Sequence, residues 1–150
     1  MRSSKPLNLL LLVLTILVIG LPCFIVATTK EWMPPELTKW RVEIVNGLRN
    51  NAALFVHCKS KENDLGIHNL TAVRNFTWSF RENFFHRTLF WCYLRKGDAH
   101  ANFNVFWHDV LLFYKCGWKS CVWTAKDDGI YLKDFIKDSE ELCEKWKPGS

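Results

Sequence analysis

Residues 40–45 have the sequence WRVEIV, in which every second side chain is apolar as far as Ile44. Neighbouring side chains of a β-strand point to opposite faces. Trp40, Val42 and Ile44 would therefore share one face, and the two charged side chains the other. The stretch predicts a strand with one buried face.

The same alternation recurs in short runs along the chain, and turn-forming residues separate the runs. Further strands are expected at residues 54–59, 76–80, 88–94, 102–107, 110–114, 122–123 and 130–132. Turn signals lie at Asn46-Gly47, Lys96-Gly97-Asp98 and Asp127-Asp128-Gly129. About seven or eight short antiparallel strands predict an all-β fold, a small disulfide-stabilised β-sandwich.

Two segments depart from this pattern. Residues 60–69 are polar and predict a loop. In the tail, Asp138 and Glu141 have the spacing of a helix capping box, and Leu142 and Trp146 are four residues apart. These signals predict a short C-terminal helix.

The chain begins with the features of a secretory signal peptide. The basic residues Arg2 and Lys5 precede an apolar run over residues 7–27 that ends at the small residue Ala27. We expect cleavage after Ala27 and export of residues 28–150 as one secreted, extracellular domain with no stable membrane insertion. The alternative is an uncleaved anchor, because the apolar run is just long enough to span a bilayer as a helix.

The charge of the chain is moderately basic. The whole sequence has 20 basic and 15 acidic residues and a net charge of +5, which falls to +3 when Arg2 and Lys5 leave with the signal peptide. These charges are interspersed. A nucleic-acid-binding domain would cluster its basic residues on one stripe, so no nucleic acid is expected as a partner.

Cysteine usage points to disulfides, because the expected compartment is oxidising. Cys23 lies in the expected signal peptide and leaves an odd number in the mature chain. The four cysteines in or beside apolar runs are Cys58, Cys92, Cys116 and Cys121. They allow three pairings, which stay open. Cys143 lies in a charged tail and is the expected odd member. We expect a monomer, although Cys143 would allow a covalent dimer.

Two acceptor sequences for N-linked glycans follow the first cysteine. They are Asn69-Leu70-Thr71 and Asn75-Phe76-Thr77, and neither has proline in the middle. Behind a signal peptide, Asn69 and Asn75 are expected to be glycosylated.

The sequence has no pattern of a catalytic or cofactor site. His57 and Cys58 are neighbours on an expected strand, so they point to opposite faces and the histidine cannot activate the thiol. Zinc bound by Cys116 and Cys121 with two further ligands is disfavoured by oxidation. We expect no enzyme, no metal and no cofactor, and a small secreted hydrolase such as a ribonuclease is the remaining catalytic alternative.

Eight tryptophans are many for a chain of this size. Trp78, Trp91 and Trp107 occupy alternating strand positions and are expected in the core. Trp118 lies among polar and basic residues and is expected to be exposed. Exposed tryptophans could stack on sugars, so the alternative function is that of a secreted carbohydrate-binding or defence protein.

Several of these segments together resemble a known family. They are VEIVNGL at 42–48, LFVHCKSKENDLG at 54–66, WSF at 78–80, TLFWC at 88–92, CVW at 121–123 and DDGIY at 127–131. In this order they resemble the plant self-incompatibility S-protein family, whose members are called S-protein homologues. The resemblance implies a compact β-sandwich exported from a plant cell, with two disulfides among the four cysteines of the strand-like runs. Its founding members are pistil-secreted ligands that a pollen receptor recognises.

We therefore expect a secreted plant ligand for an unidentified cell-surface receptor, acting in pollen recognition or other cell–cell signalling. Loops on a rigid scaffold suit such binding because part of the ordering cost is already met. The three connections richest in charge are residues 60–69, 95–100 and 115–120. Within the last of these, Lys115, Trp118 and Lys119 are the preferred receptor contacts, with Trp118 as an aromatic anchor.

Overall fold

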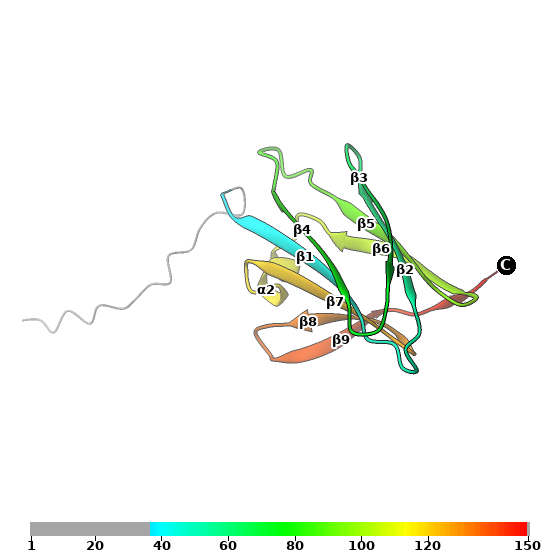
Figure 1. Cartoon of the computed structure of the whole chain (residues 1–150). Coiled ribbons are helices and arrows are strands. Elements are labelled where there is room, and N and C mark those ends of the chain that lie inside the picture. The colour runs from blue at the N-terminus through cyan, green and yellow to red at the C-terminus, as the bar shows by residue number, and fades with distance from the viewer. Residues whose placement is uncertain (1–36, 150) are drawn as a thin grey trace, which may run out of the picture. The chain divides into compact units, whose positions relative to one another are not determined.

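The computed structural model describes residues 37–149, which form two five-stranded β-sheets and one short helix (Figure 1). The elements are β1 (Lys39–Asn46), β2 (Leu54–Ser60), β3 (Asp64–Leu70), β4 (Asn75–Arg81), β5 (Phe90–Lys96), β6 (Ala99–Phe106), α2 (Val110–Lys115), β7 (Ser120–Lys126), β8 (Gly129–Asp134), β9 (Ser139–Glu144) and β10 (Lys147–Pro148). The strand order is β4-β1-β7-β8-β9 in the first sheet and β10-β6-β5-β2-β3 in the second.

The predicted β-sandwich is confirmed, and its core lies where the alternation in the sequence placed it. Trp40, Val42 and Ile44 on β1 are completely buried. The two sheets are joined across the core by a hydrogen bond from the indole Nε1 of Trp123 on β7 to the carbonyl oxygen of Val105 on β6, at 3.0 Å. Burial of these apolar side chains is the main stabilising contribution in a domain of this kind.

One strand pairing differs from the expected antiparallel arrangement. β1 and β7 are parallel neighbours, with Arg41 opposite Ser120 and Asn46 opposite Ala125. The side-chain period is the same in parallel and antiparallel strands, so local alternation cannot reveal this pairing. Between β1 and β7 the chain forms β2 and β3 of the second sheet, returns to the first sheet as β4, and then forms β5, β6 and α2.

The expected C-terminal helix is wrong, because residues 139–144 form strand β9 and pair antiparallel with β8. The turn between them is closed by Asp134, whose carboxylate accepts the backbone N–H groups of Ile136 and Lys137 at 2.9 and 3.0 Å. Asp138, which had the position of a helix cap, instead forms an ion pair with Lys133 at 2.5 Å. Pairing with β8 therefore overrides the local helix signal.

Two further local expectations are corrected. Residues 110–114, expected as a strand, belong to helix α2, where the Asp109 carboxylate caps the first turn by accepting the N–H of Leu112 at 2.7 Å. Residues 60–69, expected as a loop, contain only a short turn before the edge strand β3. β3 is polar because it is an edge strand and most of its side chains are exposed.

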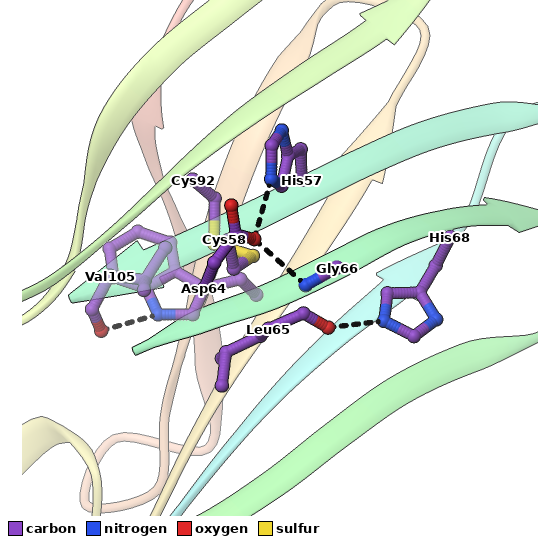
Figure 2. Close-up of a disulfide and its surroundings, with 9 residues drawn as sticks. His57, Cys58, Asp64, Leu65, Gly66, His68, Cys92 and Val105 are labelled. Carbon is purple, nitrogen blue, oxygen red and sulfur yellow. Dashed lines mark hydrogen bonds and ion pairs between the residues drawn. A yellow bond between two sulfur atoms is a disulfide. The ribbon is translucent and has the colours of Figure 1, made fainter. Parts of the chain in front are cut away.

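Two disulfides stabilise the sandwich. Cys58 on β2 lies directly opposite Cys92 on β5, and the bond between them joins neighbouring strands of the second sheet (Figure 2). Cys116 and Cys121 close the segment that leads from α2 into β7. Cys143 on β9 is a free, exposed cysteine. This is the division into four paired cysteines and one odd member that the sequence predicted.

The expected signal peptide, residues 1–27, lies outside the described residues, so cleavage after Ala27 stays a prediction. Within residues 37–149, no helix is long and apolar enough to cross a membrane.

Candidate recognition surface

Four connections meet at one end of the sandwich, which we call the helix end. They are the β2–β3 turn at 61–63, the β4–β5 loop at 82–89, the segment 107–119 with α2, and the β8–β9 turn at 135–138 (Figure 1). Residues 37–38, which precede β1, lie at the same end. The strand register brings them together, since Lys39 at the start of β1 lies opposite Arg81 at the end of β4. Phe80 next to Arg81 also packs against Phe106 of the second sheet, with ring centroids 4.7 Å apart.

Exposed apolar side chains gather at the helix end. Among residues 37–149, twelve large hydrophobic side chains are exposed, and nine of them are here. The nine are Leu37, Phe84, Phe85, Leu89, Val110, Leu111, Tyr114, Phe135 and Ile136. Scattered single apolar residues are normal on a protein surface, but a concentration at one end marks an interaction site.

Phe84 and Phe85 are the most exposed of the nine, at 82% and 76%. Their loop is held by hydrogen bonds: Asn83 N–H donates to Thr88 Oγ1, and the Asn83 side chain accepts the N–H of Arg87, both at 2.8 Å. The loop therefore presents two aromatic rings in a defined arrangement. Sequence reasoning missed this pair, although two adjacent phenylalanines in a polar segment, outside any alternating run, were the available signal.

Basic side chains surround the apolar ones at the helix end. Six of them are exposed and form no ion pair within the described part of the chain: Lys39, Lys61, Arg81, Arg87, Lys119 and Lys137. Glu82, the acidic residue of the β4–β5 loop, is buried. Asp138 is exposed but paired with Lys133. Glu62 in the β2–β3 turn is exposed and forms no ion pair among the described residues. The six basic residues outnumber it, so the rim of this surface has a net positive charge.

The three predicted receptor contacts lie at the helix end but differ in accessibility. Lys119 is exposed. Lys115 is mostly buried, and its ammonium group forms an ion pair with Glu141 at 2.6 Å, which raises the pKa of the lysine. Trp118, expected to be exposed, is half-buried and packs against the ring of Trp40, with centroids 6.4 Å apart.

Of the other two predicted loops, only the first part of residues 60–69 lies at the same end as residues 115–120. The turn at 61–63 lies at the helix end, whereas residues 95–100 form the β5–β6 turn at the opposite end. The two glycosylation candidates are also near the opposite end, since Asn69 pairs with Phe55 and Asn75 with Val45. Both asparagines are exposed. Glycans at these positions would leave the helix end uncovered.

His57, Asp64 and Gly66 form a polar cluster on the outer face of β2 and β3 (Figure 2), and Lys59 joins it. The Asp64 carboxylate accepts the Gly66 N–H at 2.9 Å and lies 2.8 Å from His57 Nε2 and 2.9 Å from Lys59 Nζ. These contacts, with the Gly66 amide first, hold the pKa of Asp64 well below its ordinary value of 3.8. Cys58 points the other way, into the core, as a strand requires. The cluster is structural and fixes the turn into β3.

The structure contains a small pocket of about 260 Å³ between α2 and the strands, lined by residues that include Trp107, Leu111, Lys115 and Cys143. Pockets for small-molecule ligands are usually about 300–1,000 Å³. A second, open and mostly polar hollow of about 630 Å³ lies at the opposite end, where Tyr93, Arg95 and His100 line it. A group that could hold a metal ion lies elsewhere, where Glu82, His86 and His108 meet beneath the β4–β5 loop.

Residues 41–146 match the family model of plant self-incompatibility protein S1. The chain belongs to this family. It is 52% identical over 122 residues to S-protein homolog 74 of Arabidopsis thaliana, covering 81% of each chain, and 50% identical over 122 residues to S-protein homolog 1 of the same plant, again covering 81% of each.

Two further S-protein family comparisons are informative. Self-incompatibility protein S1 of Papaver rhoeas is 35% identical over 92 residues, which cover 60% of this chain and 65% of that protein. The solved structure of a self-incompatibility protein homologue, described as belonging to a widespread family of small, highly stable, secreted plant proteins, superimposes with a TM-score of 0.59 at 22% identity. It covers 73% of this chain and 96% of the other. That likeness supports the sandwich fold.

Proposed function

We propose that this S-protein family member is secreted and acts as a ligand that binds a cell-surface receptor protein through its helix end. The observation that carries the proposal is the concentration of exposed apolar side chains at that end, nine of the twelve on the described residues. The proposed activity is binding without catalysis. The same binding step would serve pollen recognition or another kind of cell–cell signalling.

The chemistry of the surface describes the partner it fits. Phe84 and Phe85 would anchor in an apolar groove, since aromatic anchors commonly carry about 2 kcal/mol or more of binding energy each. The basic rim, which includes Arg87 and Lys119, would be complementary to carboxylates around that groove and would speed encounter. Lys119 keeps its predicted role as a contact, and the anchor role passes from Trp118 to the phenylalanines.

The positions of the glycosylation candidates support the same surface. Asn69 and Asn75 lie near the opposite end of the sandwich, so glycans there would not cover the helix end. A bulky glycan makes the surface around it a poor site for a protein partner.

The alternative of carbohydrate binding by exposed tryptophans has less support. Seven tryptophans fall within residues 37–149, and each of them is buried or half-buried. A flat, exposed tryptophan platform is therefore absent from this part of the chain. The exposed aromatic rings are those of phenylalanine and tyrosine at the helix end.

Binding of the labelled secreted protein to plant cell membranes separates the two functions. We expect saturable binding that unlabelled protein competes away, that prior protease treatment of the membranes abolishes, and that glycosidase treatment leaves intact. Binding that survives protease but disappears after digestion of wall glycans would contradict the proposal and favour the carbohydrate-binding alternative.

A further inference from the structure

Three side chains with metal-ligand chemistry meet beneath the β4–β5 loop. Glu82, His86 and His108 each contribute one ligand atom, and these atoms lie within 4.8 Å of one another. The ring centroids of the two histidines are 4.2 Å apart. This cluster is separate from the proposed receptor contacts, because the most exposed side chains of the loop are Phe84 and Phe85.

Glu82 is the unusual member of the cluster. Its side chain is fully buried, and a buried carboxylate is costly unless both oxygens have partners. Oε1 lies 2.6 Å from His108 Nδ1. Oε2 has no hydrogen-bond partner among the described residues, and His86 Nδ1 lies 4.0 Å from it. The buried oxygen therefore faces an imidazole across a gap that a cation could bridge.

We propose that Glu82, His86 and His108 bind one divalent transition-metal ion, with zinc as the best match. Two imidazole nitrogens and one carboxylate oxygen are ligands that zinc prefers, and a water molecule would take the fourth tetrahedral position. Calcium and magnesium prefer sites made wholly of oxygen ligands, which this one is not.

The dimensions of the cluster suit this ion. Zinc bonds of about 2.0–2.1 Å place tetrahedral ligand atoms roughly 3.3 Å apart. The 4.0 Å between Glu82 Oε2 and His86 Nδ1 would close by less than about 1 Å, which a side-chain rotation can supply. The 2.6 Å hydrogen bond between His108 Nδ1 and Glu82 Oε1 would open by a similar amount, because the ion takes the place of the shared proton. The side chains of His86 and His108 are 41% and 34% exposed, so the ion and its water can enter from solvent.

A bound ion would connect two segments of the helix end. Glu82 and His86 lie in the β4–β5 loop, and His108 lies just before α2. The bound ion would thus hold the β4–β5 loop, which carries Phe84 and Phe85, against the segment that leads into α2.

Calorimetric titration of the secreted protein with Zn²⁺ tests the site, and the visible absorption of bound Co²⁺ reports its geometry. We expect one ion per chain, with absorption bands typical of tetrahedral coordination. His86→Asn and His108→Gln should each weaken Zn²⁺ affinity at least about tenfold. Asparagine suits position 86 because the backbone of His86 has a φ of +54°, a left-handed conformation that asparagine tolerates.

His57→Gln is the matched control, because His57 also lies beside a carboxylate but belongs to the Asp64 cluster. It should leave Zn²⁺ affinity unchanged. Cys143→Ser removes the free thiol as a competing ligand and should not change the stoichiometry. Near-ultraviolet circular dichroism would verify that each variant is folded. Absence of Zn²⁺ binding by the wild type, or tight binding that persists in the folded His86→Asn, His108→Gln double variant, would overturn the proposal.

Discussion

The carboxylate of Asp64 accepts the backbone N–H of Gly66 at 2.9 Å, and Gly66 has a φ of +80°. This local bond fixes the entry into β3 while His57 and Lys59 on β2 hold the same carboxylate. The segment HCKSKENDLG, which is one of those that carry the family resemblance, is therefore a single structural unit. The contacts of His57 and Lys59 with Asp64 hold the two strands of the β2–β3 hairpin together, and Cys58 points into the core.

Gly66→Ala should destabilise the domain. A Cβ at this position has open space, with its nearest neighbour 4.0 Å away, so the cost comes from the positive φ. We expect the free energy of unfolding to fall by about 1–2 kcal/mol in chemical denaturation. Gly66→Asn is the matched comparison and should cost less, because asparagine tolerates a left-handed backbone. Equal losses for the two variants would show that conformation is not the cause.

Asp64→Asn should change how stability depends on pH. The folded-state pKa of Asp64 is lowered, so its contribution is fully present above its ordinary value of 3.8 and is lost as pH falls below that value. The difference in melting temperature between wild type and variant should be largest near about pH 6 and shrink toward about pH 2. A difference that stays constant over this range would contradict the assignment.

The two disulfides and the free thiol should behave differently. Reduction should cost about 2–5 kcal/mol per bridge, and Cys58→Ser should prevent accumulation of folded secreted protein. Cys143→Ser should change stability by no more than about 0.5 kcal/mol, since Cys143 lies exposed on the edge strand β9. Thiol counting under denaturing conditions, without reductant, should find one free thiol per mature chain. Five free thiols would refute the disulfide framework.

The same thiol should react slowly at neutral pH. Cys143 is exposed as a residue, but partial burial of its thiol raises the pKa above its ordinary value of 9.0, so little thiolate is present. Alkylation with iodoacetamide should be slower than for a cysteine in an unstructured peptide, and the two rates should become equal once the protein is denatured. A native rate as fast as the peptide rate would contradict this burial.

The sequence predicted the sandwich because its strands alternate strictly, as at Trp40, Val42 and Ile44. It predicted the paired cysteines because secretion implies oxidation. It could not predict strand β9, because the residues after Asp138 have a local helix signal and only pairing with β8 decides their conformation. Nor could it show that β1 lies parallel to β7, since the partners Arg41 and Ser120 are far apart in the chain.

The recognition surface was harder to predict for a related reason. Charge in single loops favoured residues 95–100 and 115–120, yet the structure places these two loops at opposite ends. The gathering of apolar side chains arises from four connections, and it becomes visible only when the strand register is known. Phe84 and Phe85 could have been noticed as adjacent aromatics outside any alternating run.

Removal of the glycan sites should leave receptor binding unchanged. Asn69→Gln and Asn75→Gln should each lower the mass of the secreted protein by one glycan. Because both positions lie near the end opposite the α2 helix, affinity for responding membranes should stay within about twofold. A large loss of affinity in a folded variant would place the binding surface at the glycan-bearing end.

The affinity of the folded Phe84→Ser, Phe85→Ser double variant for membranes of the responding cell tests the central claim most directly. The control is Val73→Ser, because Val73 is 88% exposed in the β3–β4 connection at the opposite end. If the helix end is the binding surface, the double variant should bind at least about 30-fold more weakly than wild type, while the control binds normally. Unchanged affinity of the double variant, or an equal loss in the control, would contradict the account.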